Sequence, residues 1–471
     1  MLSSLSAPSV RRRGAVRLVD AALVSGLLAA GLLATAGVAV ADGTPQSGGG
    51  ATATIGGLKT YGTAVIHDGD ANEQVPAGLF EMSVDNGGTL QTYCIDLHTP
   101  TQKDARYHET PWSGTSLSGN KNAGKIRWIL QNSYPQVNDL AELAAKAGAK
   151  GLTEQDAAAG TQVAIWRYSD GADVDAVDPR AEKLADYLEE NARTLAEPAA
   201  SLTLDPPAVS GHPGERLGPV TVHTNADSAT VRPPADAMAS GVKIVDKRGK
   251  AVTSATDGSR IYVEVPKEAQ DGWVELSVQA STTVPVGRAF VSETRSQTQI
   301  LAGSSESTVS ATATANWAVA GAIPALSAVQ DCAKSAVDIT AVNKGDEPFT
   351  FALMGTEHTI PAGKSQTVAI PLQEDQAYDF TVKGPGGYQK RFKGVLDCKT
   401  EGRTANLTTQ TVSEPSPATG GAAAPTDADT NLAETGTSSA TPLIAGTAIG
   451  LVVIGGAALL LVRAKKTPKR D

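Results

Sequence analysis

The feature that most constrains this chain is an apolar segment close to each end. Near the N-terminus, arginines at positions 11–13 and 17 precede an apolar run over residues 21–38. The small residues that signal peptidase needs follow directly and end at Ala41. This pattern predicts a signal peptide over residues 1–41, cut between Ala41 and Asp42; an uncleaved membrane helix is the alternative.

At the other end, residues 442–462 form an apolar segment, and roughly 20 apolar residues suffice to cross a bilayer. A basic tail follows at 463–471, and basic residues favour the cytoplasmic side of a membrane. We therefore expect an exported chain with a single C-terminal transmembrane anchor. Everything between the two segments should fold outside the cell, where disulfides form.

The residues ahead of this segment read Leu432-Ala433-Glu434-Thr435-Gly436. They resemble the Leu-Pro-x-Thr-Gly signal of sortase substrates, with alanine where proline is usual. The resemblance implies that sortase cuts between Thr435 and Gly436 and joins Thr435 to peptidoglycan; a plain single-pass membrane protein is the alternative. Residues 401–431 are rich in Thr, Ala, Pro, Gly and Ser, which predicts a disordered linker through the wall.

Charge and length narrow the remaining possibilities. The chain has 50 acidic and 40 basic residues, a net charge of −10, and both of its ends are basic, so the middle is more acidic still. Nucleic acid requires a basic surface, so we expect no nucleic-acid partner. At 471 residues the chain is too long for one core, and several folded domains are expected.

The chain has three cysteines, an odd number for an exported protein. Cys332 and Cys398 bracket one segment and are predicted to form a disulfide. Cys94 is left without a partner, so it either stays a buried thiol or takes part in chemistry.

Residues 55–195 show strand patterns first and helical patterns second, which predicts an α+β domain. The expected strands are 63–66, 78–84 and 90–98, and the expected helices start after Asn138, Thr153 and Asp178 and near residue 126. The helix after Thr153 has a capping-box pattern with Asp156, carries Gln162 and should stop at Gly171.

Two further segments have the alternating pattern of β domains. Residues 200–317 predict a sandwich of immunoglobulin-like size. Residues 320–400 predict a smaller β domain stapled by Cys332 and Cys398. The expected architecture is therefore multidomain, with an α+β head, two all-β sandwich-like stalk domains, the linker and the anchor.

The surroundings of Cys94 and Gln162 predict chemistry between them. In a strand, Cys94 shares a face with Thr92 and Asp96, whereas apolar residues take the other face. On its helix, Gln162 is flanked by apolar groups that include Trp166, which indicates an amide buried against a specific partner. A thiolate held against that amide could displace ammonia and form an internal thioester, provided that water is kept away.

Tyr93-Cys94 in a β region, followed by Thr161-Gln162-Val163-Ala164-Ile165-Trp166 on a later helix, resembles the two signatures of the thioester domains of Gram-positive surface adhesins. The family's glutamine signature reads Thr-Gln-x-Ala-(Ile or Val)-Trp, and every defined position matches. The resemblance covers residues 55–195.

This resemblance implies that Cys94 and Gln162 form the thioester. We expect the pocket around it to include Tyr93, Asp96, Thr161 and Trp166, although Tyr93 and Trp166 could equally be ordinary core aromatics. An amine on an extracellular target would attack the thioester and leave a covalent link, one per molecule, so the protein is expected to be an adhesin and not an enzyme.

Two other functions remain open at this point. A cysteine hydrolase or transglutaminase would use Cys94 as nucleophile and needs a histidine within hydrogen-bond reach, for which His98 and His108 are the nearest in sequence. A wall-anchored stalk could instead bind its partner without covalent chemistry. No metal site or cofactor is predicted. The predicted partners are signal peptidase, sortase with peptidoglycan, and the amine-bearing target.

Overall fold

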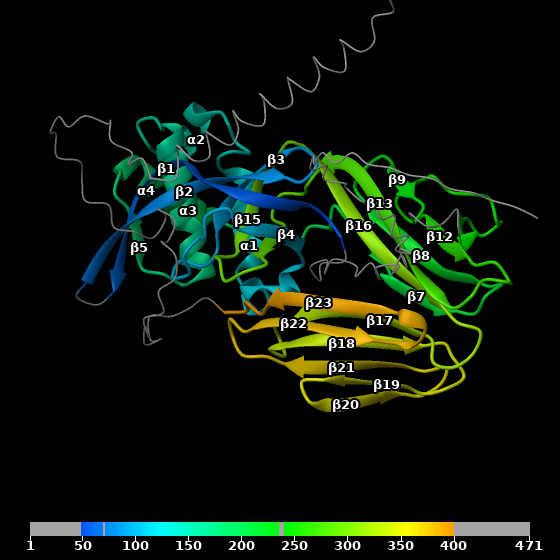
Figure 1. Ribbon diagram of the computed structural model, residues 1–471. Coiled ribbons are helices and arrows are strands. Elements are labelled where there is room, and N and C mark those ends of the chain that lie inside the picture. Colours follow the sequence, from blue (N-terminus) through cyan, green and yellow to red (C-terminus); the bar gives the residue numbers. More distant parts are fainter. Residues whose placement is uncertain (1–48, 69–70, 235–239, 400–471) are drawn as a thin grey trace, which may run out of the picture. The chain divides into compact units, whose positions relative to one another are not determined.

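The computed structural model describes residues 49–68, 71–234 and 240–399 (Figure 1). Outside these residues lie the predicted signal peptide, linker, sorting signal, transmembrane segment and basic tail, together with the predicted cut sites at Ala41–Asp42 and Thr435–Gly436. Within the described ranges, no helix is both long and apolar enough to span a membrane.

The first module contains helices on a curved sheet. Its helices are α1 (Ala123–Asn132), α2 (Leu140–Lys146), α3 (Glu154–Ser169) and α4 (Pro179–Asn191). Its strands are β1 (Thr52–Asp68), β2 (Ala71–Val84), β3 (Thr89–Cys94), β4 (Arg106–Thr110), β5 (Val174–Ala176), β14 (Ala289–Ser292) and β15 (Gln299–Ser304).

The order of these strands is β2-β3-β15-β14-β4-β1-β5, and all neighbours are antiparallel. β1 also pairs with β2 from Ala53 to Asp68, which closes the sheet into a ring. Helix α3 packs on β1, β2 and β3 and so brings its buried residues to the strand that carries Cys94.

The second module has two sheets, as expected for a sandwich. One has the order β10-β12-β8-β6 and the other β11-β9-β13-β16-β7. Its strands are β6 (Leu202–Asp205), β7 (Ala208–Gly211), β8 (Arg216–Thr224), β9 (Ala229–Arg232), β10 (Lys243–Val245), β11 (Ser254–Ala255), β12 (Arg260–Glu264), β13 (Gly272–Thr283) and β16 (Glu306–Trp317).

The sequence predicted that residues 200–317 form a domain separate from residues 55–195. Part of that second segment instead belongs to the sheet of the first module. β13 and β16 pair along their full lengths, and the chain between them leaves the sandwich to form β14 and β15 in the first sheet, where β15 lies beside β3 (Figure 1). The prediction missed this because alternation identifies a strand but says nothing about which distant strand it pairs with. One continuous apolar core accordingly runs from Ala51 to Trp317.

The third module has a core of its own, built from residues 322–396. Its strands are β17 (Pro324–Asp331), β18 (Ala336–Asn343), β19 (Phe349–Leu353), β20 (Thr356–Ile360), β21 (Ser365–Pro371), β22 (Ala377–Lys383) and β23 (Gln389–Val395). The predicted disulfide between Cys332 and Cys398 is present, and Cys94 is free and buried.

Most local signals near the site are confirmed. Thr153 and Asp156 form the capping box of α3, and Gly171 follows it with a φ of 64°. Several boundaries differ from the prediction. Strands β1 and β2 begin well before the expected strands 63–66 and 78–84. The N-cap of α2 is Asp139, one residue later than expected, because its carboxylate accepts from the backbone N–H of Glu142. Strand β3 ends at Cys94 and not at residue 98.

Candidate functional site

Gln162 is fixed by a helix that is buried along most of its length. The capping box starts α3 at Glu154, and every residue from Asp156 to Trp166 is buried. Gly160 lets α4 approach closely, because a Cβ there would lie 2.4 Å from the backbone oxygen of Ala181. The helix is therefore held between α4 and the sheet, and the Gln162 side chain points into the protein with no exposed surface.

The Gln162 carboxamide binds the backbone of Cys94 through two hydrogen bonds. The Cys94 N–H donates to Gln162 Oε1 at 3.0 Å, and Gln162 Nε2 donates to the Cys94 carbonyl oxygen at 2.9 Å. The register explains why these backbone groups are free to do so. Pairing between β2 and β3 stops at Phe80 and Thr92, so no strand takes up the next pair of groups on that side. The amide occupies the place of the missing strand.

The end of β3 has a related cause. Leu97 gives its backbone N–H to Asp170 Oδ1, at 3.0 Å, instead of to a neighbouring strand. Asp170 is the C-cap residue of α3, so the same helix that supplies Gln162 also turns the chain away after Cys94.

The sulfur of Cys94 lies among polar side chains that sequence reasoning did not single out. Its thiol donates to Gln297 Oε1 at 2.5 Å and accepts from Gln299 Nε2 at 3.3 Å. Gln299 is the residue directly opposite Cys94 in the β3–β15 pairing. Two glutamines spaced two apart at the start of β15, one just before the strand and one its first residue, were the available signal. Nothing local to either glutamine indicates a partner strand.

The other predicted pocket residues lie near the pair in different ways. Trp166 lines a small cavity together with Cys94, Gln162 and Gln297. The Tyr93 hydroxyl donates to the backbone oxygen of Tyr134 at 2.8 Å, and the Thr161 hydroxyl to that of Ala157 at 2.7 Å. These two hydroxyls are thus already engaged with backbone. Asp96 is buried, and its backbone oxygen accepts from Gln297.

Burial dominates the electrostatics around the sulfur. It raises the pKa of the Cys94 thiol above its usual range, a hydrogen bond from Gln299 acts against it, and Asp96 and Asp170 raise that pKa further. Burial also raises the pKa of Asp96 to about 6 and that of Asp170 to about 7. The thiol is therefore protonated at neutral pH. The nearby carboxyl groups of Asp96 and Asp170 titrate close to neutral pH.

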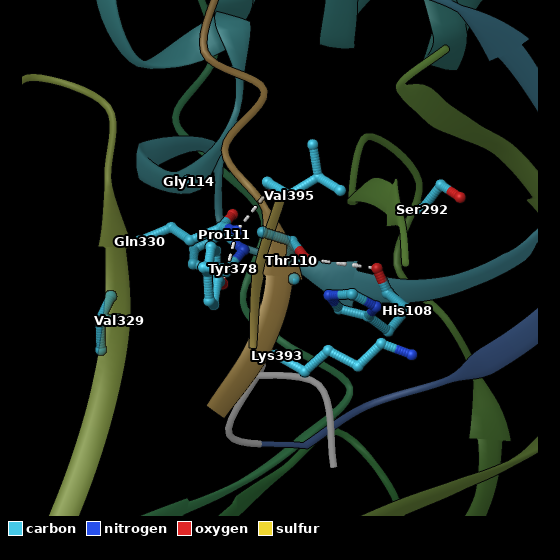
Figure 2. A pocket seen from close by; sticks show the side chains of 11 residues that line it. His108, Thr110, Pro111, Gly114, Ser292, Val329, Gln330, Tyr378, Lys393 and Val395 are labelled. Atoms are coloured by element: carbon cyan, nitrogen blue, oxygen red, sulfur yellow. Dashed lines mark hydrogen bonds between the residues drawn. The ribbon is translucent and has the colours of Figure 1, made fainter. Parts of the chain in front are cut away.

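The histidines do not reach the sulfur. All six lie within the described residues, and none has a hydrogen bond to Cys94. His108 lines a different cavity, with Tyr378 and Gln330 of the third module (Figure 2). Burial lowers the pKa of His108 to about 4, which leaves its ring neutral. The structure thus lacks the cysteine–histidine contact that a hydrolase requires.

No grouping of three or more His, Cys, Asp or Glu side chains in the described part of the chain is arranged to hold a metal ion.

Comparison with known proteins supports the predicted resemblance. Residues 91–194 match the family model "Thioester domain", and the matched segment contains both Cys94 and Gln162. The match covers less than half of the chain, and it ends about a hundred residues before Gln297. Residues 323–395, in the third module, match "Bacterial phospholipase C, C-terminal domain". No curated protein is significantly similar to the chain in sequence.

Solved structures give weaker likenesses. The Bacillus anthracis TIE protein is 16% identical over 73% of this chain and 63% of its own, with a TM-score of 0.26. The thioester domain of the Enterococcus faecium TIE86 protein is 15% identical over 57% of this chain and 97% of its own, with a TM-score of 0.27. TM-scores this low do not establish a common fold, and more than a third of the first protein is unmatched.

Proposed function

We propose that this protein is a cell-surface adhesin that attaches covalently to its target through a thioester between Cys94 Sγ and Gln162 Cδ. The observation that carries the proposal is the pair of hydrogen bonds that hold the Gln162 amide against the Cys94 backbone. A glutamine with a purely structural role does not need to lie beside the one free cysteine of the described chain.

The same contacts favour bond formation. As sulfur attacks Cδ, negative charge develops on Gln162 Oε1, and the Cys94 N–H already donates to that oxygen. The S–Cδ bond forms, the Cδ–Nε2 bond breaks, and the thiol proton leaves with the amide nitrogen as ammonia. Complete burial of Gln162 keeps bulk water from the product.

A primary amine on the target then attacks the same carbon. A new amide bond forms, the C–S bond breaks, and sulfur takes up the proton that the amine loses. Each molecule reacts once, which is adhesion and not turnover. We further propose export by the predicted signal peptide and attachment of Thr435 to peptidoglycan by sortase. Attachment by sortase is supported by the order of three features along the chain: the sorting signal comes first, then the apolar segment, then the basic tail.

The experiment is the intact mass of residues 42–431, which include all the described structure, compared with Cys94→Ala. We expect the parent to be lighter than its disulfide-corrected sequence by one ammonia, and the variant not to be. Methylamine should then add to Gln162 and release one thiol. A full-mass parent with a free Cys94 thiol would refute the covalent mechanism and leave a non-covalent stalk.

A further inference from the structure

The sulfur of Cys94 is contacted by two glutamines that lie outside both the predicted domain and the matched family segment. We propose that Gln297 and Gln299 hold the Cys94 sulfur and stabilise it as the leaving group when an amine opens the thioester. The inference rests on the proposed function, because it assigns residues to that same reaction.

The β3–β15 register places Gln299 beside Cys94, and the residues directly before β15 bring Gln297 to the same sulfur. Cys94 and Gln299 are directly opposite in antiparallel strands, so their side chains share a face of the sheet. Gln297 is two residues earlier and on the same side, and it lines the cavity that Cys94 and Gln162 line. Cys94, Gln297 and Gln299 are each at most 2% exposed.

The two glutamines offer the sulfur opposite functions. Gln299 Nε2 donates a hydrogen bond to sulfur, which stabilises the negative charge that appears as the C–S bond breaks. Gln297 Oε1 accepts from the thiol, so it favours the S–H group that is left once sulfur has taken up the proton of the amine. Neither glutamine gains or loses a proton in the step. The new C–N bond and the new S–H bond account for the bonds that break.

Both amides are held in a fixed orientation. The Thr92 hydroxyl donates to Gln299 Oε1 at 2.9 Å, which points the Gln299 NH₂ group towards the sulfur. The Thr101 hydroxyl donates to Gln297 Oε1 at 2.6 Å, and Gln297 Nε2 donates to the backbone oxygen of Asp96. A group that is already oriented needs no rearrangement as charge develops.

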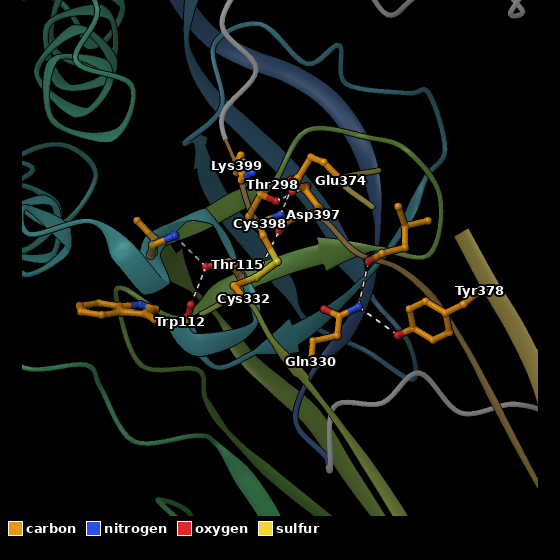
Figure 3. The surroundings of a disulfide bond; sticks show 12 residues. Trp112, Thr115, Thr298, Gln330, Cys332, Glu374, Tyr378, Asp397, Cys398 and Lys399 are labelled. Carbon is orange, nitrogen blue, oxygen red and sulfur yellow. Dashed lines mark hydrogen bonds between the residues drawn. A yellow bond between two sulfur atoms is a disulfide. The ribbon is translucent and has the colours of Figure 1, made fainter. Parts of the chain in front are cut away.

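The residue between the glutamines is anchored by the third module. The Thr298 hydroxyl donates to Asp397 Oδ2 at 2.7 Å, and Asp397 directly precedes the disulfide residue Cys398 (Figure 3). The segment that carries both glutamines is therefore held by the pairing of β15 with β3 and by the hydrogen bond from Thr298 to Asp397.

The test measures how fast methylamine opens the thioester in residues 42–431, followed by intact mass and normalised to the fraction that lacks one ammonia. Gln299→Met removes the donor to sulfur. Gln299→Glu also removes it but keeps an acceptor for Thr92. We expect both variants to react about tenfold more slowly, the usual effect of one hydrogen bond to a developing charge. Gln297→Met should slow the reaction by about threefold, as for a neutral hydrogen bond.

Gln136→Met is the matched control, because Gln136 donates to the backbone of Ala302 on the same strand β15, at 2.8 Å, and not to the sulfur. Its rate should equal that of the parent. Parent-like rates in both Gln299 variants would overturn the inference while leaving the thioester intact. A parent that retains its ammonia would instead refute the proposed function itself.

Loss of folding in Gln299→Met would show as loss of cooperative thermal unfolding. In that case Gln299→Glu and Thr92→Val decide the matter. Thr92→Val leaves Gln299 in place but frees its amide to rotate, so we expect a slower reaction in a variant that still unfolds cooperatively. Parent-like rates in these two variants would also overturn the inference.

Discussion

The two sides of Cys94 come from very different parts of the chain. The amide side is supplied by α3, whose Gln162 is 68 residues away in sequence. The sulfur side is supplied by Gln297 and Gln299, 203 and 205 residues away. The first side belongs to one contiguous segment with recognisable local signals. The sulfur side exists only because β15, in the connection between β13 and β16, pairs with β3. The surroundings of one cysteine are thus set partly by a local segment and partly by the pairing of distant strands.

Each side also has its own source of stability. On the helix side, α3 depends on its capping box and on burial between α4 and the sheet. On the sulfur side, Arg288, which directly precedes β14, forms a buried ion pair with Glu109 of β4, with Nε and Oε1 2.8 Å apart. Four experiments would break or sharpen this comparison.

The largest effect is expected from Gln162→Glu. The glutamate keeps the oxygen that accepts from the Cys94 N–H but has no ammonia to lose, so thioester formation should be abolished entirely. Intact mass would show the full sequence mass and no addition of methylamine. Gln136→Glu is the control, since it alters an amide that binds the backbone of β15 at Ala302 and not Cys94. A loss of ammonia that survived Gln162→Glu would contradict the assignment.

Arg288→Met tests the sulfur side. It leaves the Glu109 carboxylate buried without its cation, which typically costs about 3–5 kcal/mol of unfolding free energy. Urea unfolding would measure this loss, and the fraction of thioester should fall with it. Arg106→Met is the control, because Arg106 lies on β4 together with Glu109. The Arg106–Asp85 ion pair is exposed and should contribute less than about 1 kcal/mol to the free energy of unfolding. Equal losses in both variants would show that burial does not matter here.

The pH dependence of stability tests Asp96, which is buried beside the sulfur. Burial raises its pKa from 3.8 to about 6, so the folded protein retains this proton longer than the unfolded chain does. The contribution of Asp96 to stability is therefore greatest below about pH 4 and is lost as pH rises through 6, by roughly 3 kcal/mol. Urea unfolding of Asp96→Asn should show a smaller fall over pH 4–6 than the parent, and an identical fall would contradict the assignment.

The smallest effect is expected from Thr153→Ala, which removes half of the α3 capping box. The loss should be about 1 kcal/mol of unfolding free energy. Asp139→Ala removes the corresponding cap of α2, which carries no site residue, and should cost a similar amount. Methylamine should open the thioester more slowly only in Thr153→Ala; a change in the Asp139 variant as well would indicate a general loosening of the module.

The sequence by itself predicted that Cys94 and Gln162 act together, and it predicted much of what surrounds Gln162 on its helix. The capping box, the helix through Gln162 and its end at Gly171 follow from short-range rules. The Cys332–Cys398 disulfide follows from the number and positions of the cysteines, and the structure contains each of these features. Local hydrogen bonds and spacing determine these features, so a reader of the sequence can find them.

Only the tertiary structure decided the other side. Residues 289–304 have the same strand character as their neighbours in the sandwich, yet they pair with β3 and β4. This pairing is made with strands almost 200 residues earlier and is accompanied by the buried Arg288–Glu109 ion pair. Neither feature can be recognised from the residues near 289–304 alone. For this reason Gln297 and Gln299 could be assigned to the sulfur only once β15 was placed beside Cys94.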